Sequence, residues 1–160
     1  MSTSDLPLAK RPFGSTELRV SPLGLGTVKL GRNTGVKYPQ PFEIPDDAAA
    51  SDLIALAKSL GINLIDTAPA YGNSEQRLGT LLKGQRQDWV ICSKVGEEFD
   101  AGKGSSHFDF SARHTRQSIE RSLDRLNTDY LDIVLIHSDG HDEHILQHEG
   151  ALAALQQCKQ

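Results

Sequence analysis

LDIVLIH, at residues 131–137, is the stretch that decides how this chain folds. Its centre is a continuous aliphatic run, whereas a strand with one face in water alternates apolar and polar residues. Such a run predicts a strand covered on both faces, as in a parallel sheet flanked by helices. Similar runs occur earlier, at residues 62–65 and 89–92, with a brief one at residues 22–27. The chain is therefore expected to hold four strands of one parallel sheet.

The segments between these strands have the pattern of helices. Capping residues predict helix starts at Asp46 and Asp47, at Ser74 and at Ser111, and glycines at positions 61 and 84 end the first two helices. A fourth helix is expected over residues 142–159. The apolar residues at helical spacing are Leu53, Ile54, Ala57 and Leu60 in the first helix, Leu78, Leu81 and Leu82 in the second, Ile119, Leu123 and Leu126 in the third, and Ile145, Leu152 and Leu155 in the fourth.

The order of these elements predicts an α/β fold. Four βα units in series lay their strands side by side in chain order, with all helices on one side if the sheet curls toward a barrel. A doubly wound sheet would need a glycine-rich turn between the first strand and a helix, but GLGTVK at residues 24–29 lacks the third glycine. A long loop over residues 31–45 is expected there instead of a helix, so we reject a Rossmann domain. Residues 11–21 are expected to form a small hairpin.

Composition excludes several classes of protein. The 160 residues are 38% hydrophobic and 24% charged, which is enough for one folded domain. A net charge of −4 and a pI near 5.8 argue against nucleic acid or an anionic membrane as a partner. No apolar run approaches the ~20 residues of a membrane span, and residues 1–5 do not look like a secretory leader. Two cysteines without a disulfide framework are typical of a cytoplasmic protein.

Polar residues follow three consecutive strands. Asp66, Lys94 and His137 come at the expected strand ends, and Tyr71 lies in the loop five positions after Asp66. Each alone has an ordinary structural explanation. Because the carboxyl ends of parallel strands meet at one edge, where active sites of such folds lie, we expect the four side chains to cluster there.

These residues lie in motifs that resemble the aldo-keto reductase family. GINLIDTAPAYGNSE at residues 61–75 is similar to the family signature around its catalytic aspartate and tyrosine, and ICSK at 91–94 and DYLDIVLIH at 129–137 to its lysine and histidine strands. The resemblance runs from about residue 13 to about residue 159. It implies an eight-stranded barrel that reduces carbonyls with a nicotinamide cofactor, NADP, with Thr27, Val28 and Asp66 near the nicotinamide ribose.

The residue types suit that chemistry. Tyr71 is the expected proton donor to a carbonyl oxygen that receives negative charge. Lowering a phenol pKa from about 10 to near 7 takes roughly 4 kcal/mol, which one cation about 4 Å away supplies at an effective dielectric near 20. Lys94 is therefore expected to lower the pKa of Tyr71, with Asp66 holding its ammonium. Neutral His137 is expected to donate a hydrogen bond to the substrate oxygen.

Three other features have less specific interpretations. A histidine-rich segment at residues 139–148 offers spacing for a metal site, but a polar outer helix face explains it better, and no metal is expected. Its members are His141, His144 and His148 with Asp139, Asp142 and Glu143. Residues 95–110 are expected to form a long loop above the site, and Cys92 to fill the core.

The resemblance also implies that residues 1–160 form the N-terminal half of such a barrel. Four strands leave two open edges, which favours self-association, and no basic cluster matches the family's phosphate site. The chain by itself is therefore expected to be weakly active or inactive. Two alternatives stay open: a barrel aldolase that uses Lys94 as a Schiff-base nucleophile, and a truncated, non-catalytic subunit that binds or regulates a partner.

Overall fold

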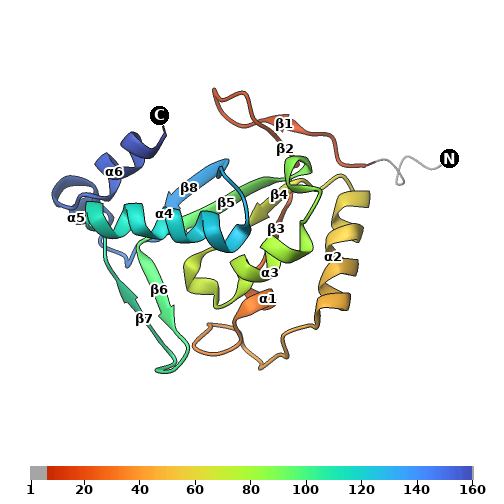
Figure 1. The fold of residues 1–160 in the computed structure, drawn as a ribbon, viewed down its shortest axis with the longest axis horizontal. Coiled ribbons are helices and arrows are strands. Elements are labelled where there is room, and N and C mark those ends of the chain that lie inside the picture. Colours follow the sequence, from red (N-terminus) through yellow and green to blue (C-terminus); the bar gives the residue numbers. More distant parts are fainter. Residues whose placement is uncertain (1–6, 160) are drawn as a thin grey trace.

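The fold is built on a four-stranded parallel sheet. The computed structural model describes residues 7–159, so the expectation about a leader at residues 1–5 lies outside it. The strands are β3 (Gly24–Gly26), β4 (Leu64–Asp66), β5 (Val90–Val95) and β8 (Ile133–Ile136). They pair in the order β3-β4-β5-β8, which is chain order (Figure 1). The predicted parallel sheet is confirmed.

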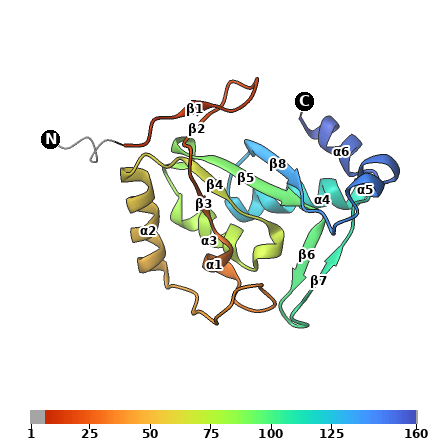
Figure 2. The same cartoon turned by 180° about the vertical axis from the view of Figure 1, so that it is seen from behind.

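The main helices lie on one side of this sheet (Figures 1 and 2). They are α2 (Asp47–Ser59), α3 (Ser74–Leu81), α4 (Ala112–Leu126) and α6 (Ala151–Cys158). The capping predictions hold for α2 and α4, because the Asp46 carboxylate accepts from the Ala49 amide and the Ser111 hydroxyl from the His114 amide. No helix in residues 7–159 is long and apolar enough to cross a membrane.

The start of α3 differs from expectation. Ser74 is the first residue of the helix rather than its cap, and Asn73 precedes it. The Ser74 side chain is fully buried, and its hydroxyl donates to Thr27 Oγ1 at 2.8 Å instead of accepting from the helix. The hydroxyl therefore links Thr27 and Thr67, the residues that follow β3 and β4, and does not cap the helix.

Three segments that were expected as loops or one helix fold differently. A one-turn helix, α1 (Val28–Gly31), follows β3 before the long loop. The expected loop over 95–110 is largely an antiparallel hairpin of β6 (Glu97–Asp100) and β7 (Ser105–Phe108). The expected helix over 142–159 is split into α5 (Asp142–His148) and α6, because the backbone of Glu149 between them is extended. The N-terminal hairpin of β1 (Arg11–Pro12) and β2 (Arg19–Val20) is confirmed.

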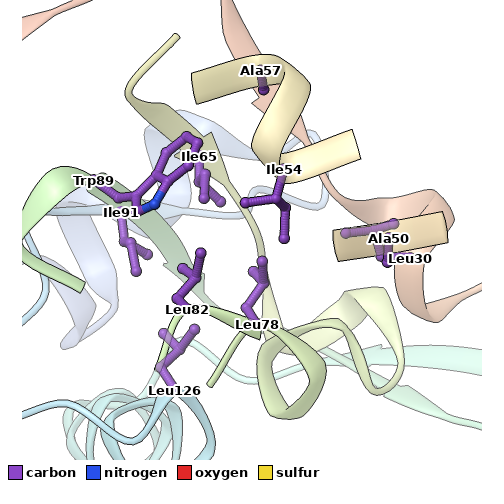
Figure 3. Close-up of a cluster of buried hydrophobic side chains, with 10 residues drawn as sticks. All are labelled: Leu30, Ala50, Ile54, Ala57, Ile65, Leu78, Leu82, Trp89, Ile91 and Leu126. Atoms are coloured by element: carbon purple, nitrogen blue, oxygen red, sulfur yellow. The ribbon is translucent and has the colours of Figure 1, made fainter. Parts of the chain in front are cut away.

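The main core lies between the sheet and helices α2, α3 and α4 (Figure 3). Its buried side chains are Leu30, Ala50, Ile54, Ala57, Ile65, Leu78, Leu82, Trp89, Ile91 and Leu126. The expected apolar face of α2 is partly wrong, since Leu53 and Leu60 are 41% and 51% exposed. The smaller residues Ala50 and Ala57 face the core beside Ile54, which lets α2 lie close to the strands.

Among residues 7–159, helices cover one face of the sheet and leave the other without a helix (Figures 1 and 2). The expectation that every strand is buried on both faces is therefore wrong for β8, none of whose residues is fully buried. Ile91 and Ser93 of β5 point toward the helices, so the alternate residues Cys92 and Lys94 lie on the opposite face, here called the open face. Leu135 pairs with Lys94 on that face and is 46% exposed. β8 is also an edge strand of the described sheet.

Candidate active site

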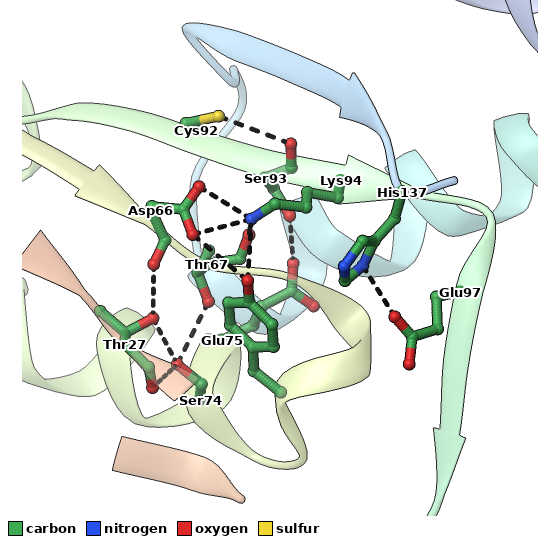
Figure 4. A network of polar contacts seen from close by, with 11 residues as sticks. Thr27, Asp66, Thr67, Ser74, Glu75, Cys92, Ser93, Lys94, Glu97 and His137 are labelled. Carbon is green, nitrogen blue, oxygen red and sulfur yellow. Dashed lines mark hydrogen bonds and ion pairs between the residues drawn. The ribbon is translucent and has the colours of Figure 1, made fainter. Parts of the chain in front are cut away.

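Four polar side chains gather at the carboxyl end of the sheet, as the sequence predicts. Asp66 ends β4, Lys94 lies near the end of β5, and His137 follows β8. Tyr71 ends the short 3₁₀ helix η2 (Pro69–Tyr71), which brings its ring back over the strand ends. Figure 4 shows the network seen from close by.

Lys94 is the centre of the group. Its Nζ lies 2.8 Å from both carboxylate oxygens of Asp66, 3.0 Å from the Thr67 carbonyl oxygen and 3.2 Å from the Tyr71 hydroxyl. The side chain is only 11% exposed, so the ammonium exchanges water for these partners. Lys94 is thereby fixed with one hydrogen-bonding direction aimed at Tyr71.

The pKa of Tyr71 is raised, which corrects the expectation that Lys94 lowers it toward neutrality. Burial of the phenol has the largest effect, and the opposing charge of Lys94 does not overcome it. Asp66 adds to the rise, because its Oδ1 lies 3.4 Å from the Tyr71 hydroxyl and its charge offsets that of Lys94. Tyr71 is therefore a protonated phenol at neutral pH, which suits a proton donor.

Lys94 is an ammonium at neutral pH. Burial lowers its pKa, but the hydrogen bond and charge of Asp66 and the contact with Tyr71 outweigh burial, so the pKa is raised overall. A Schiff-base lysine needs a free amine, and therefore a depressed pKa. The geometry thus opposes the aldolase alternative.

His137 stands next to Tyr71 and contacts an unexpected partner. The two rings are perpendicular, with centroids 6.0 Å apart. Nδ1 of His137 lies 3.1 Å from Oε2 of Glu97, on strand β6. Burial lowers the pKa of His137, and the Glu97 charge only partly restores it. The ring is accordingly neutral at neutral pH.

A network of buried hydroxyl groups holds the backbone of β4 at Asp66. Thr27 donates from both its amide and its hydroxyl to the Asp66 carbonyl oxygen, at 3.0 and 2.9 Å, and Ser74 bonds Thr27 and Thr67. Thr27 has no exposed surface, so in this structure it cannot touch a cofactor as expected. Its place is that of a support for β4. Val28, at the start of α1, is partly exposed and keeps that expectation.

Sequence reasoning missed three charged residues around the site. Glu97 and Arg32 lie in segments expected to be loops, and only the folded hairpin brings them to His137. Glu75, buried in α3, accepts a hydrogen bond from the Ser93 hydroxyl at 2.7 Å and lies 3.3 Å from Arg125. It therefore binds β5 on the side that faces the helices. Glu75 belongs to the motif at residues 61–75, which is the signal that could have singled it out.

Cys92 lies on the open face beside Asp66 and is 5% exposed. Burial, together with the charge of Asp66, raises its pKa from 9.0 to about 11, so it stays a thiol and is no nucleophile at neutral pH. The expected role in packing fits this burial.

The raised pKa of Cys92 predicts a loss of stability at alkaline pH. Between pH 9 and about 11 the folded chain keeps the thiol proton that the unfolded chain releases, so the free energy of unfolding falls as pH rises. Tyr71 and Lys94, whose pKa values are also raised, extend the fall above pH 10. Urea unfolding at several pH values should show a shallower fall between pH 9 and 10 for Cys92→Ala. Cys158→Ala, at an exposed position, is the matched control and should keep the parent slope.

The histidine-rich segment has no metal-binding geometry. Within residues 7–159, no group of three or more His, Cys, Asp or Glu side chains could hold a metal ion. His141 contacts Asp139 at 3.1 Å and His144 contacts Glu149 at 3.6 Å, and both imidazoles are mostly exposed.

A parallel βα sheet with an aspartate, a tyrosine, a lysine and a histidine at its carboxyl edge defines a class of oxidoreductase, the aldo-keto reductases. The family model described as "Aldo/keto reductase family" matches residues 22–160. This chain belongs to that family, and its fold is of the (β/α)₈ barrel type, with four of the parallel strands present.

Solved structures agree with this assignment. A Pseudomonas aeruginosa protein described as an aldo-keto reductase is 61% identical, with a TM-score of 0.85 over 94% of this chain and 55% of its own. An aldo-keto reductase from Bacillus halodurans in its holo form is 33% identical, with a TM-score of 0.77 over 95% of this chain and 46% of its own.

Curated relatives include L-galactose dehydrogenase from Arabidopsis thaliana, 39% identical over 79% of this chain and 37% of its own length. D-arabinose 1-dehydrogenase from Saccharomyces cerevisiae is 38% identical, covering 74% and 33%. NADH-specific methylglyoxal reductase from Escherichia coli is 34% identical, covering 81% and 42%. The chain thus spans less than half the length of these relatives.

Proposed function

We propose that this chain is the catalytic half of a cytoplasmic reductase that uses NADPH to convert a small aldehyde or ketone to an alcohol, with Tyr71 as the proton donor. The observation that carries the proposal is the position of Lys94, whose Nζ lies 3.2 Å from the Tyr71 hydroxyl while both Asp66 oxygens hold it. That arrangement keeps a protonated phenol beside a fixed cation at the open end of the strands.

The residues on the open face fit the nicotinamide end of such a cofactor. Gly26 pairs with Asp66 in the sheet, and a side chain at Gly26 would meet nothing within 4 Å, so the space beside Asp66 is free. Asp66, which is 38% exposed, borders this space, and Val28, two positions after Gly26, is partly exposed. NADP stays our expectation, although one relative is named as NADH-specific.

Each side chain has a defined task in the proposed reaction. When bound, the nicotinamide supplies a hydride to the carbonyl carbon, so the electron pair of the C=O bond moves to oxygen. Tyr71 gives its hydroxyl proton to that oxygen, which completes the alcohol. Lys94 stabilises the phenolate that remains, because its Nζ already faces the phenol oxygen. Asp66 keeps the ammonium in place.

The proposal is tested in a chimaera of residues 1–160 and the C-terminal part of the Pseudomonas aeruginosa protein. This chain is 61% identical to the part of that protein that it replaces, so it should pack against the C-terminal part as one barrel. NADPH and NADH are titrated separately by fluorescence, and turnover is assayed with small aldehydes and ketones. Reduction with a preference for NADPH is expected. A folded chimaera that binds neither cofactor would remove the proposed function.

We further propose that isolated residues 1–160 self-associate. Strands β3 and β8 have no partner on their outer edges within residues 7–159, and the open face exposes Leu135 at 46%. Unpaired edges and exposed apolar surface drive association. Size-exclusion chromatography with light scattering should show mass increasing with concentration. Leu135→Lys should shift the chain toward monomer, whereas Leu53→Lys, on the outer side of α2, should not.

A further inference from the structure

The guanidinium of Arg32, the residue that follows α1, is buried and held on several sides. The side chain is 8% exposed, and its Cζ lies 3.7 Å from the centroid of the Phe99 ring. It donates four hydrogen bonds, to the carbonyl oxygens of Thr34, Gly35 and Ala70 and to the hydroxyl of Ser106. A guanidinium carries five N–H donors, so most of this capacity is used inside the chain. Arg32 therefore binds other segments of the protein rather than a substrate.

The bond to Ala70 bears most directly on the site. It measures 2.9 Å, joins buried groups, and holds the carbonyl directly before Tyr71. Gly31 contacts the other side of the same turn. A side chain at Gly31 would overlap the Tyr71 carbonyl oxygen, and one at Gly72 would overlap the Gly31 carbonyl oxygen. Residues 31 and 32 thus contact the backbone both before and after Tyr71.

The same guanidinium reaches the β6–β7 hairpin. Its Nη1 lies 3.5 Å from Oε1 of Glu97 and 3.4 Å from the Ser106 hydroxyl, which itself donates to Glu97. Glu97 in turn lies beside His137. Figures 1 and 2 show the loop after α1 next to the tip of this hairpin. One side chain therefore joins the turn that carries Tyr71 to the hairpin beside His137.

The contacts of the Tyr71 hydroxyl itself are long. It lies 3.2 Å from Nζ of Lys94 and 3.4 Å from Oδ1 of Asp66, at or beyond the usual limit for a hydrogen bond. Such contacts leave the ring free to shift, so the backbone on either side must set its place. We infer that Arg32 is a positioning residue, which holds the Tyr71 hydroxyl beside Lys94 by joining η2 to the β6–β7 hairpin.

The consequence for catalysis rests on the proposed function. Tyr71 can give its proton only while its hydroxyl stays within reach of the carbonyl oxygen, and a displacement of about 1 Å can slow such a step about 10²-fold. Arg32→Met keeps an unbranched stem against the Phe99 ring and removes every donor of the guanidinium. We expect it to lower kcat and to leave the affinity for NADPH almost unchanged.

Arg86, at the start of η3 (Arg86–Asp88), offers a matched control. Its Cζ lies 4.0 Å from the centroid of the Tyr130 ring, and it donates to the carbonyl oxygens of Trp89 and Tyr130. It also contacts a carboxylate, that of Asp132, at 2.8 Å. These partners lie just before β5 and β8, at the end of the sheet opposite to the site. Arg86→Met therefore removes a comparable set of contacts without touching Tyr71.

The position of Tyr71 is tested by NMR of residues 1–160 with labelled tyrosine and histidine. The Tyr71 and His137 rings, whose centroids are 6.0 Å apart, should give a nuclear Overhauser effect. Its signals are assigned by their loss in Tyr71→Phe and His137→Gln. Arg32→Met should weaken or abolish this effect, and Arg86→Met should keep it. An unchanged effect in a folded Arg32→Met chain would overturn the inference.

A second measurement needs no variant. In the parent chain the Nη protons of Arg32, assigned through the backbone, should give separate signals that exchange slowly with water, because the guanidinium is buried and hydrogen-bonded. A freely rotating, rapidly exchanging guanidinium would overturn the inference, so a misfolded Arg32→Met does not block the test.

The catalytic consequence is measured in the chimaera. Arg32→Met should lower kcat at least about tenfold with NADPH affinity retained, whereas Arg86→Met should keep the parent kcat even if its Tm falls as far. A parent kcat in Arg32→Met would overturn the positioning role. A parent chimaera without activity would count against the proposed function and leave the NMR results standing.

Discussion

Tyr71→Phe should lower kcat of the chimaera by about 10²–10⁴-fold while leaving its affinity for NADPH almost unchanged. Only the hydroxyl is removed, so the step that loses its proton donor slows and the binding surface is kept. The ring itself remains under Lys94, whose Nζ lies 4.7 Å from the ring centroid. Steady-state kinetics together with fluorescence titration of the cofactor measure the two effects separately.

A matched control is Tyr38→Phe. Tyr38 also lies under a lysine, with Lys29 Nζ 4.5 Å from its ring centroid, but it is 44% exposed and belongs to the loop after α1. Its kcat should stay at the parent value. A Tyr71→Phe chimaera that keeps the parent kcat would show that another group gives the proton, and would leave Tyr71 with a packing role.

Residues 1–160 purified alone should reduce carbonyls more than about 10³-fold more slowly than the chimaera, although all four site residues are present. The four side chains act on a substrate only when the hydride donor is held against it, and that positioning provides several kcal/mol. Within this sequence no basic cluster resembles the family's phosphate site, so the affinity for NADPH should fall as well. The assay follows NADPH fluorescence and turnover over the same range of protein concentrations.

Concentration is the useful variable in that experiment. If two copies of residues 1–160 associate through β8, they duplicate the four site residues and add no new phosphate contacts. Turnover should therefore stay low even where light scattering shows dimers. Micromolar binding of NADPH with steady turnover by the isolated chain would contradict the prediction and show that residues 1–160 already hold the cofactor.

Some residues of the site could be placed from the sequence, whereas a close neighbour in the chain could not. Asp66 and Lys94 could be placed at one edge of the sheet because parallel strands end together, whatever their distance in the chain. Glu97 lies only three positions after Lys94, yet its contacts with His137 and Arg32 could not be predicted from the sequence. Its partners His137 and Arg32 come from distant segments, and only the turn of the β6–β7 hairpin brings them within reach.

Local patterns also failed where burial decides the outcome. Ser74 has the sequence context of a helix cap, but in the folded chain its buried hydroxyl donates to Thr27 instead. Leu53 fits the apolar spacing of α2, yet the small side chains of Ala50 and Ala57 set which side lies against the sheet. Local propensity allows a residue several roles, and tertiary packing determines which of them it has in the folded chain.

The sequence by itself determined the four parallel strands, their order, and the gathering of Asp66, Tyr71, Lys94 and His137, because these follow from apolar runs and from the geometry that parallel strands share. The tertiary structure alone decided the protonation of the site. The pKa of Tyr71 is raised rather than lowered, because burial and the charge of Asp66 outweigh the field of Lys94. Burial likewise lowers the pKa of His137, and the charge of Glu97 only partly restores it. Such energies depend on distances of a few ångströms and on exclusion of water, and neither is written in the order of the residues.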